Sequence, residues 1–483
     1  ETDAACAFYR SGFKEAVSVI VDGAGTFINL ETNSDHVTGW ETESIFKCEY
    51  PATFTTLYKH IGIREARAGG IFKKFPSDKY GEPGTHEVRI ADHAGIVKAY
   101  EAVTEYCGFN AIEAGKTMGL FPYGKKTDKI PPLFDTTGIY PSTNRNLIVP
   151  RYPNGAVIND MFYEYLSDRN ADDLTTLDNR RDLAFAVQTQ TQEQVLNLII
   201  KATEMAGTKN VVLSGGFGLN CVANYFYLDK LNELGINFYV EPVSNDAGTA
   251  MGAAMMIHRS TTADCEIVDY KSNLYLGPVH TYTQDDIEKV CAIYDAEFTD
   301  AKYEDVVALL KNKNIVAMFQ GSSENGPRAL GNRSILFDPT FKDGKDFVNE
   351  VKRREYFRPF AGSILKEHVH DWFDLRGMDE SPNMMYAVNC QPGVEEKIPS
   401  IIHVDGTCRI QTVTHDQNEH FYNLINAFYK ETGVPILFNT SFNLGGDPLV
   451  ETLADAVDTI ARSDIEYLYL PEYKKLIRVL NEN

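Results

Sequence analysis

The stretch from Gly321 to Arg333 gathers residue types that could bind an anion: three glycines, one carboxylate and two arginines five positions apart. Glycine lets backbone N–H groups approach a ligand closely, and arginine presents a fixed fork of donors that matches phosphate or carbamate oxygens. A surface turn with two solvated arginines would show the same short pattern. The candidate anion-binding residues of this stretch are Glu324, Gly326, Arg328 and Arg333.

Buried strands must hold these residues in place. The apolar runs Ile315–Phe319 and Ile335–Phe337 flank the stretch and predict two such strands. A third run, Ala16–Val21, predicts a strand that ends at Asp22, directly before a glycine turn. An aspartate at this place faces a cleft, although Asp-Gly is also a common hairpin turn.

Two strand–glycine loop–helix units follow in the middle of the chain. Asn210–Leu213 runs into a glycine-rich loop, and Asn237–Val240 runs into a loop that precedes a small-residue helix, Thr249–Met256. Such units place backbone amides and a helix N-terminus at a ligand, which favours an α/β nucleotide-binding layer. No G-K-[ST] follows, so the first loop is not a P-loop. Its candidate contacts are Gly215, Gly216, Gly218 and Asn220.

Apolar spacing predicts the remaining helices. They are Arg181–Met205, Thr281–Tyr294 with Thr283 as its cap, Tyr303–Lys311, His420–Thr432 ending at Gly433, and Glu451–Ala461. Gly115–Gly124 is predicted to be a turn-rich loop, whose Lys116 is either a phosphate contact or solvated. Pro435–Phe438 predicts a strand with a polar turn, Asn439–Asn443, at its end. The polar stretch His258–Asp269 predicts a linker between domains 1–270 and 271–483.

The bulk properties exclude several classes of protein. The 483 residues are 43% hydrophobic and 24% charged, as in ordinary globular proteins, and no apolar run is long enough for a membrane span. The eight cysteines form no C-x-x-C pair, which favours free thiols in a reducing compartment, and we expect a cytoplasmic protein. The net charge of −22 argues against a broad nucleic-acid-binding surface.

Seven ordered blocks resemble the O-carbamoyltransferase family, the antibiotic- and nodulation-factor-tailoring enzymes of the NodU/CmcH type. The central block is GPRALGNRSIL, at Gly326–Leu336. The others are GKTMGLFPYG (115–124), SGGFGLNCVAN (214–224), PVSNDAGTAMGAA (242–254), VKRREYFRPFAGSIL (351–365), RIQTV (409–413) and PILFNTSFNLGGDPLV (435–450).

The resemblance implies an α/β protein with two domains. The N-terminal domain would be actin-like and bind metal and nucleotide, and the C-terminal domain would be YrdC-like. The second domain would make carbamoyl-adenylate from ATP and carbamoyl phosphate, and the first would pass the carbamoyl group to a hydroxyl. Cationic side chains must neutralise the phosphate charge in this chemistry, within a site shielded from water.

The family motifs assign these roles to particular residues. The catalytic cations would be Arg328, Lys352 and Arg358, although a solvated basic helix face would also explain Lys352–Arg354. Taken together with the glycine loops, the candidate contacts for nucleotide or carbamoyl phosphate are Lys116, Gly215, Gly216, Gly218, Asn220, Glu324, Gly326, Arg333, Arg354, Arg409, Asn439, Ser441 and Asn443.

The implied metal site departs from the family pattern. Family members carry H-H-x-x-H-A-x-S-A-Y-Y before the strand that ends in V-D-G, and here the same register reads ETDAACAFY. The ligands would be Asp3, in place of the last histidine, with Asp22 and Asp246. The family metal is usually iron, whereas aspartates would shift the preference towards Mg²⁺ or Mn²⁺. A chain that binds no metal is the alternative.

The family's presumed base lies in a first hairpin with an H-D-x-[AS]-A motif, which residues 1–30 lack. We therefore expect the natural protein to be longer at its N-terminus, or another segment to supply this hairpin. Sugars, macrolides, antibiotic cores and hydroxymethylated nucleobases all remain candidate alcohol acceptors, and the sequence does not give the oligomeric state. The alternatives are a threonylcarbamoyl-type enzyme acting on tRNA and a catalytically silent nucleotide-binding partner.

Overall fold

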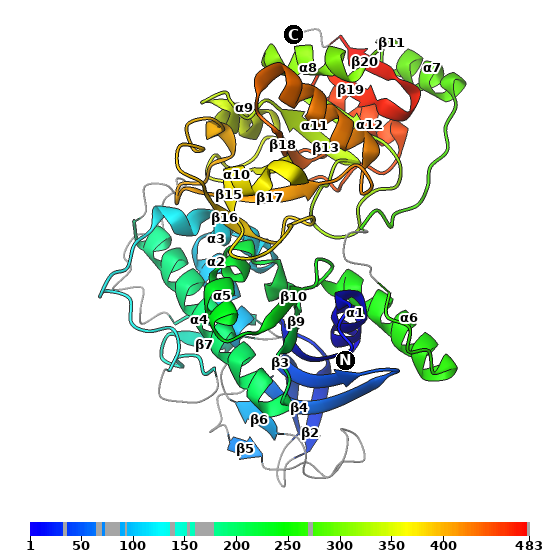
Figure 1. The fold of residues 1–483 in the computed structure, drawn as a ribbon. Helices are drawn as coiled ribbons and strands as arrows, with labels where there is room; N and C mark the ends of the chain where they lie inside the picture. The colour runs from blue at the N-terminus through cyan, green and yellow to red at the C-terminus, as the bar shows by residue number, and fades with distance from the viewer. Residues whose placement is uncertain are drawn as a thin grey trace. The chain divides into compact units, whose positions relative to one another are not determined.

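The computed structural model describes residues 1–31, 36–63, 70–72, 87–91, 94–135, 141–151, 155–159, 178–268 and 274–480. The chain divides into two compact units, Glu1–Lys271 (unit 1) and Ser272–Asn483 (unit 2). Both units mix helices with strands (Figure 1), which confirms the predicted α/β class at that level. The more specific actin-like and YrdC-like assignments stay predictions. The described residues include no helix whose length and apolar character would let it cross a membrane.

Unit 1 is built on a sheet that has eight strands among the described residues. Its central strand, β1 (Glu15–Val21), is buried along most of its length, as the apolar run predicted. β1 runs parallel to β9 and antiparallel to β3. The order of the strands in the sheet is β10 (Asn237–Val240), β9 (Asn210–Ser214), β1, β3 (His36–Glu49), β4 (Thr53–Ile63), β6 (Glu87–Ala91) and β5 (Gly70–Phe72). β2 (Phe27–Glu31) pairs with β3.

Helices of unit 1 cover this sheet. α4 (Asp178–Ala206) confirms the helix predicted at Arg181–Met205, and it buries Leu183, Val187 and Ile199 completely. The remaining α-helices are α1 (Thr2–Ser11), α2 (Ile96–Tyr106), α3 (Ala114–Leu120), α5 (Cys221–Glu233) and α6 (Asp246–Thr262). β7 (Ile148–Arg151) and β8 (Gly155–Ile158) form a separate antiparallel pair.

Small residues let α1 and α6 pack closely. A Cβ at Gly252 of α6 would lie 1.9 Å from the Thr2 carbonyl oxygen on α1, so only glycine fits there. The small-residue sequence of α6 therefore has a packing reason, independent of any ligand. α1 also contributes Ala4, Ala5 and Phe8 to the unit's buried core.

Two predictions in unit 1 are wrong. The Gly115–Gly124 stretch is not a loop, because α3 and a 3-10 turn at Phe121–Tyr123 occupy most of it and bury Leu120. The expected linker from His258 begins inside α6, which continues to Thr262. Burial explains this extension, because the Arg259 guanidinium packs 4.9 Å from the centre of the Tyr9 ring.

Unit 2 contains a sheet that has ten strands in its described part. In sheet order these are β11 (Ala296–Asp300), β20 (Lys475–Val479), β19 (Tyr467–Leu470), β12 (Val316–Phe319), β13 (Arg333–Phe337), β18 (Ile436–Ser441), β14 (Ala361–Leu365), β17 (Thr407–Val413), β16 (Ala387–Cys390) and β15 (Phe373–Asp374). β12 and β13 confirm the two strands predicted on either side of the anion-binding stretch.

Four helices of unit 2 confirm the predicted ones: α7 (Gln284–Ile293), α8 (Tyr303–Lys311), α11 (Glu419–Thr432) and α12 (Leu453–Ala461). The sequence analysis did not predict α9 (Gly344–Val351) and α10 (Val369–Trp372). Thr283 caps α7 by accepting the Asp286 N–H, and Gly433 ends α11 with a φ of 72°. One boundary is wrong: Asn439–Ser441 belongs to β18 rather than to a turn, because β13 pairs with β18 as far as Ser441.

Candidate functional site

Basic side chains of unit 2 converge near the end of β18. Lys352, the residue after α9, is only 2% exposed. Its Nζ donates to the Ser441 carbonyl oxygen at 2.5 Å and lies 3.3 Å from both Ser441 Oγ and Asn443 Oδ1. The structure therefore brings Lys352 together with two other predicted site residues, Ser441 and Asn443, which lie 89 and 91 residues further along the chain.

The electrostatics of this cluster favour an anion. Burial lowers the pKa of Lys352 well below its usual range, and the charges of Arg354 and Arg358 lower it further. Burial also lowers the pKa of Arg354, and the charges of Arg358 and Arg409 add to this effect. These shifts mean that the positive charges are poorly solvated and repel one another, so a bound phosphate would stabilise them.

Two predicted contacts hold the shape of the glycine-rich loop. The Glu324 carboxylate accepts the backbone N–H groups of Leu330 at 2.7 Å and Asn332 at 2.9 Å. Arg333 is fully buried against the Phe319 ring. Its guanidinium donates to the backbone carbonyl oxygens of Gln320, Gly321, Asn332 and Glu451. The Arg333 guanidinium therefore binds the protein's own backbone. Arg328 on the same loop is half-buried.

A buried polar network joins this loop to the sheet. Asn439 Nδ2 donates to Ser363 Oγ at 3.0 Å, and Ser363 Oγ donates to Gln411 Oε1 at 2.7 Å. Gln411 Nε2 donates to the Leu330 carbonyl oxygen at 2.9 Å. In the described part of the chain, Asn439 Oδ1 and Arg409 Nε are buried without a hydrogen-bond partner.

The sequence analysis did not single out Ser363 or Gln411. A signal was available for Ser363, because it is the polar residue of the otherwise apolar strand β14, and buried polar groups usually have a hydrogen-bond partner. Gln411 gave no such signal, because β17 also contains Arg409 and Thr412. Ala361 on β14 separates Arg409 from Asn439 in the register of the sheet. Asn439 and Arg409, which carry the two buried atoms that have no partner among the described residues, therefore lie on the strands on either side of Ala361.

Unit 1 places Asp22 where the sequence predicted, directly after β1. Its Oδ1 accepts the N–H groups of Gly23 at 2.7 Å and Gly216 at 3.3 Å. Burial raises the pKa of Asp22, while these hydrogen bonds and the charge of Lys98 oppose the rise. The glycine loop after β9 thus contacts the predicted carboxylate, and a Cβ at Gly215 would lie 2.4 Å from the Val21 carbonyl oxygen.

The three predicted metal ligands influence one another. Burial and the charges of Asp22 and Asp246 raise the pKa of Asp3 to about 6. Nevertheless, the described residues contain no group of three or more histidine, cysteine, aspartate or glutamate side chains arranged to hold a metal ion. The aspartates as placed do not complete a metal centre, and the metal remains a prediction.

Two other predicted contacts in unit 1 are engaged within the protein. Asn220 caps α5, accepting the Ala223 N–H at 3.1 Å, and donates to Gln188 Oε1 at 3.0 Å. Lys116 on α3 pairs with Glu113 at 2.7 Å. Gly218 approaches Ser244 closely, since a Cβ there would lie 2.9 Å from Ser244 Oγ.

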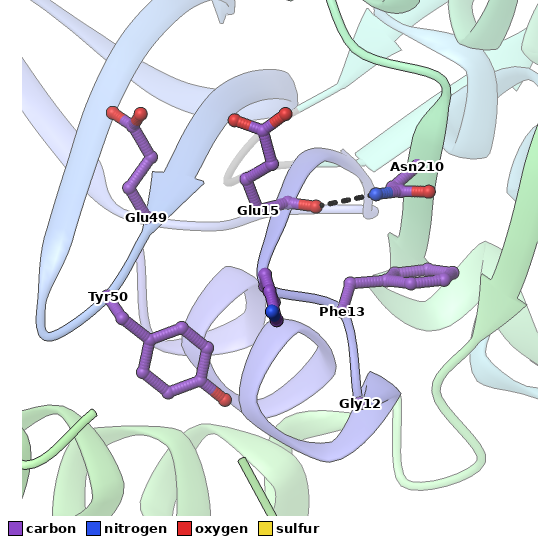
Figure 2. Close-up of a pocket in the computed structure, with 7 residues that line it drawn as sticks. Gly12, Phe13, Glu15, Glu49, Tyr50 and Asn210 are labelled. Atoms are coloured by element: carbon purple, nitrogen blue, oxygen red, sulfur yellow. Dashed lines mark hydrogen bonds between the residues drawn. The ribbon is translucent and has the colours of Figure 1, made fainter. Parts of the chain in front are cut away.

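A cavity of about 590 Å³ in unit 1 lies away from the predicted residues (Figure 2). Its lining includes Glu15 and Asn210, the first residues of β1 and β9. The Asn210 side chain donates to the Glu15 carbonyl oxygen at 3.1 Å. Glu15 and Glu49 are register partners, and their carboxylates point the same way in Figure 2. Asp22 follows the opposite end of β1, so this cavity is not part of the predicted site.

Comparisons with known proteins cover both units. The profile described as Carbamoyltransferase N-terminus matches residues 1–255, and that described as Carbamoyltransferase C-terminus matches residues 307–475. Nodulation protein NolNO of Sinorhizobium fredii is 32% identical over 401 residues, covering 79% of this chain and 55% of that protein. Nodulation protein NolO of Bradyrhizobium diazoefficiens is 28% identical over 489 residues, covering 97% of this chain and 76% of its own length.

A solved structure of full-length HypF, in a phosphate- and nucleotide-bound form, aligns with 54% of this chain and 42% of its own. The sequence identity is 13% and the TM-score is 0.30, which is too low for an argument about fold or ligands.

Proposed function

The chain belongs to the carbamoyltransferase family, and on that premise we propose that it transfers a carbamoyl group to the hydroxyl of a small molecule or modified nucleobase. Unit 2 would form carbamoyl-adenylate from ATP, carbamoyl phosphate and one water molecule, releasing phosphate and then pyrophosphate. Unit 1 would then pass the carbamoyl group to the acceptor hydroxyl, releasing AMP and the hydroxyl proton. This chain spans 55% of the length of NolNO, so the acceptor is not inferred from that relative.

The observation that carries the proposal is the poorly compensated charge around Lys352. The charges of Arg354 and Arg358 lower the pKa of Lys352, and those of Arg358 and Arg409 lower the pKa of Arg354. The carboxylate of Glu355 lies 3.6 Å from Arg358. A triphosphate or carbamoyl phosphate would supply the missing negative charge. Arginine forks can bind its oxygens in pairs and stabilise the charge that develops as the phosphate bond breaks.

The polar network beneath the glycine loop suits the neutral end of the donor. A carbamoyl group has an NH₂ that donates and a carbonyl oxygen that accepts. The buried Asn439 Oδ1 is an acceptor and the buried Arg409 Nε is a donor. We therefore assign to these two atoms the recognition of the carbamoyl group, with the phosphate facing Lys352.

In unit 1, the Gly216 N–H and Lys98 would keep the Asp22 carboxylate in place beside the glycine loop. The alcohol acceptor and the adenylate would meet at this end of β1. Because the aspartates do not complete a metal centre, no step is assigned to a metal.

Carbamoyl-phosphate-dependent exchange between ATP and labelled pyrophosphate, measured with the whole chain, tests the first step. Arg328→Ala and Arg358→Ala should lower exchange about 10²- to 10³-fold, as expected for loss of one charge-stabilising donor. Arg353→Ala is the matched control, because Arg353 is exposed and donates to the Arg462 carbonyl oxygen instead. Equal exchange in all three variants would refute the placement of the site.

A further inference from the structure

A second buried polar cluster lies in unit 1 on β3 and β4. Thr42, Glu43 and His60 are 2%, 0% and 0% exposed. Thr42 Oγ1 donates to Glu43 Oε2 at 2.7 Å, and His60 Nδ1 contacts the same carboxylate oxygen. Burial alone would raise the pKa of Glu43, but His60 and the hydrogen bonds lower it overall. The cluster thus keeps an ionised carboxylate inside the unit.

This carboxylate anchors a helix. Glu43 Oε1 accepts the N–H of Ile96, the first residue of α2, at 2.7 Å. Gly95 precedes the helix and has no side chain to cap it. A negative charge at a helix N-terminus is favourable and satisfies one of the N–H groups left open there. Glu43 therefore fixes the start of α2 against β3.

The same strand also holds Asp22. The Asp22 N–H donates to the Thr42 carbonyl oxygen at 2.9 Å. Glu43 pairs with Val21, the residue before Asp22, in the register of β1 and β3. One short segment of β3 is thus bonded both to the predicted site and to the start of α2.

α2 in turn carries two charged residues to Asp22. Lys98 is 4% exposed, and its Nζ donates to Glu101 Oε2 at 2.7 Å. A Cβ at Gly23 would lie 2.5 Å from Glu101 Oε1 and 3.4 Å from Lys98 Nζ. Glu101 and Lys98 are therefore tightly packed against Gly23, next to Asp22. A shift of α2 would change the position of Lys98 relative to the Asp22 carboxylate.

We propose that Glu43 and His60 are positioning residues for the transfer step: they fix α2 so that Lys98 and Glu101 remain packed against the Asp22 turn. This inference rests on the proposed function of unit 1. Neither residue touches a substrate, since both are fully buried, and their effect reaches the site through α2 and Thr42. A displacement of about 1 Å in a catalytic group can lower a rate by about 10²-fold, so the anchor would matter for catalysis.

The test compares Glu43→Gln with Glu41→Gln in the whole chain. Glu41 lies on the same strand and forms a part-buried ion pair, with Lys59 at 2.5 Å, yet Glu43 is the one bonded to the start of α2. Deuterium exchange of the segment 94–106 should become faster in Glu43→Gln and stay unchanged in Glu41→Gln. Transfer to an alcohol should fall about 10²-fold in Glu43→Gln, while pyrophosphate exchange stays at the wild-type level.

His60 provides a second variant if Glu43→Gln does not fold. His60→Asn retains a side-chain N–H near the position of Nδ1 and should preserve transfer, whereas His60→Leu should reproduce the loss. Unchanged deuterium exchange of α2, or unchanged transfer despite faster exchange, would overturn the inference. Loss of both chemical steps together would also overturn it. Absence of both steps in the wild type would refute the proposed function, and deuterium exchange would still decide the anchoring of α2.

Discussion

Lys352 Nζ donates a 2.5 Å hydrogen bond to the backbone carbonyl oxygen of Ser441, 89 residues further along the chain. This bond places a buried cation at the end of β18, beside the side chains of Ser441 and Asn443. Burial and the charges of two arginines lower the pKa of this ammonium group, so a bound anion would favour its protonated form.

Binding of an anion should therefore be accompanied by proton uptake. In the free protein the pKa of Lys352 is well below its usual range, and a bound phosphate would raise it. Between these two pKa values, binding takes up a proton, so affinity for ATP should decrease as the pH rises through that window. Calorimetry in buffers of different ionisation enthalpy measures the uptake. Lys352→Met should abolish it, and uptake that persists in this variant would assign the proton to another group.

Asp246→Ala should lower carbamoyl transfer while leaving carbamoyl-adenylate formation unchanged. Asp246 is the first residue of α6 in unit 1, whereas the basic cluster belongs to unit 2. Pyrophosphate exchange and acceptor carbamoylation report the two steps separately. Glu233→Ala, at an exposed ion pair of α5, is the control. Equal loss of both steps in Asp246→Ala would show that the steps are not divided between the units as proposed.

Asp3 should make the stability of the protein depend on pH. Its folded-state pKa of about 6 exceeds the ordinary value of 3.8, so the folded state binds the proton more tightly. This contribution is fully present below pH 3.8 and is lost as the pH rises through about 6. Asp3→Asn should therefore raise the melting temperature at pH 8 relative to the wild type. The corresponding increase in the free energy of unfolding is at most about 3 kcal/mol.

The same variant at pH 4 provides the control, because Asp3 is then protonated in the folded wild type. The advantage of Asp3→Asn should largely disappear at that pH. An equal stabilisation at both pH values would contradict the assignment and point to an effect of the amide itself.

Gly331→Ala should destabilise unit 2. Gly331 has a φ of +111°, and a Cβ there would lie 2.3 Å from Cδ1 of the buried Phe421 ring. Backbone strain and overpacking together predict a loss of about 2–5 kcal/mol in the free energy of unfolding. Gly433→Ala is a matched control with a φ of +72° but open space around the Cβ, and it should lose about 1–2 kcal/mol. Denaturant titration of both variants measures the difference.

The sequence by itself determined the family and those elements whose local patterns are strong. The apolar run before Asp22 became β1, the spacing of Leu183 and Val187 became α4, and Thr283 and Gly433 took their predicted places at helix ends. These features depend on neighbouring residues, because strand alternation, helix periodicity and capping are local. The seven family blocks likewise marked the segments that supply Lys352, Ser441 and Asn443.

Only the tertiary structure decided how individual polar side chains are used. Arg328 and Arg333 are both arginines of one glycine-rich stretch in the sequence. In the structure the Arg333 guanidinium is buried and donates to the backbone carbonyl oxygens of Gln320, Gly321 and Glu451. Glu43 and His60 gave no local signal, because their partners come from another strand and from the start of α2. Such roles depend on contacts between distant segments, and neither periodicity nor residue type records which distant segment will supply the partner.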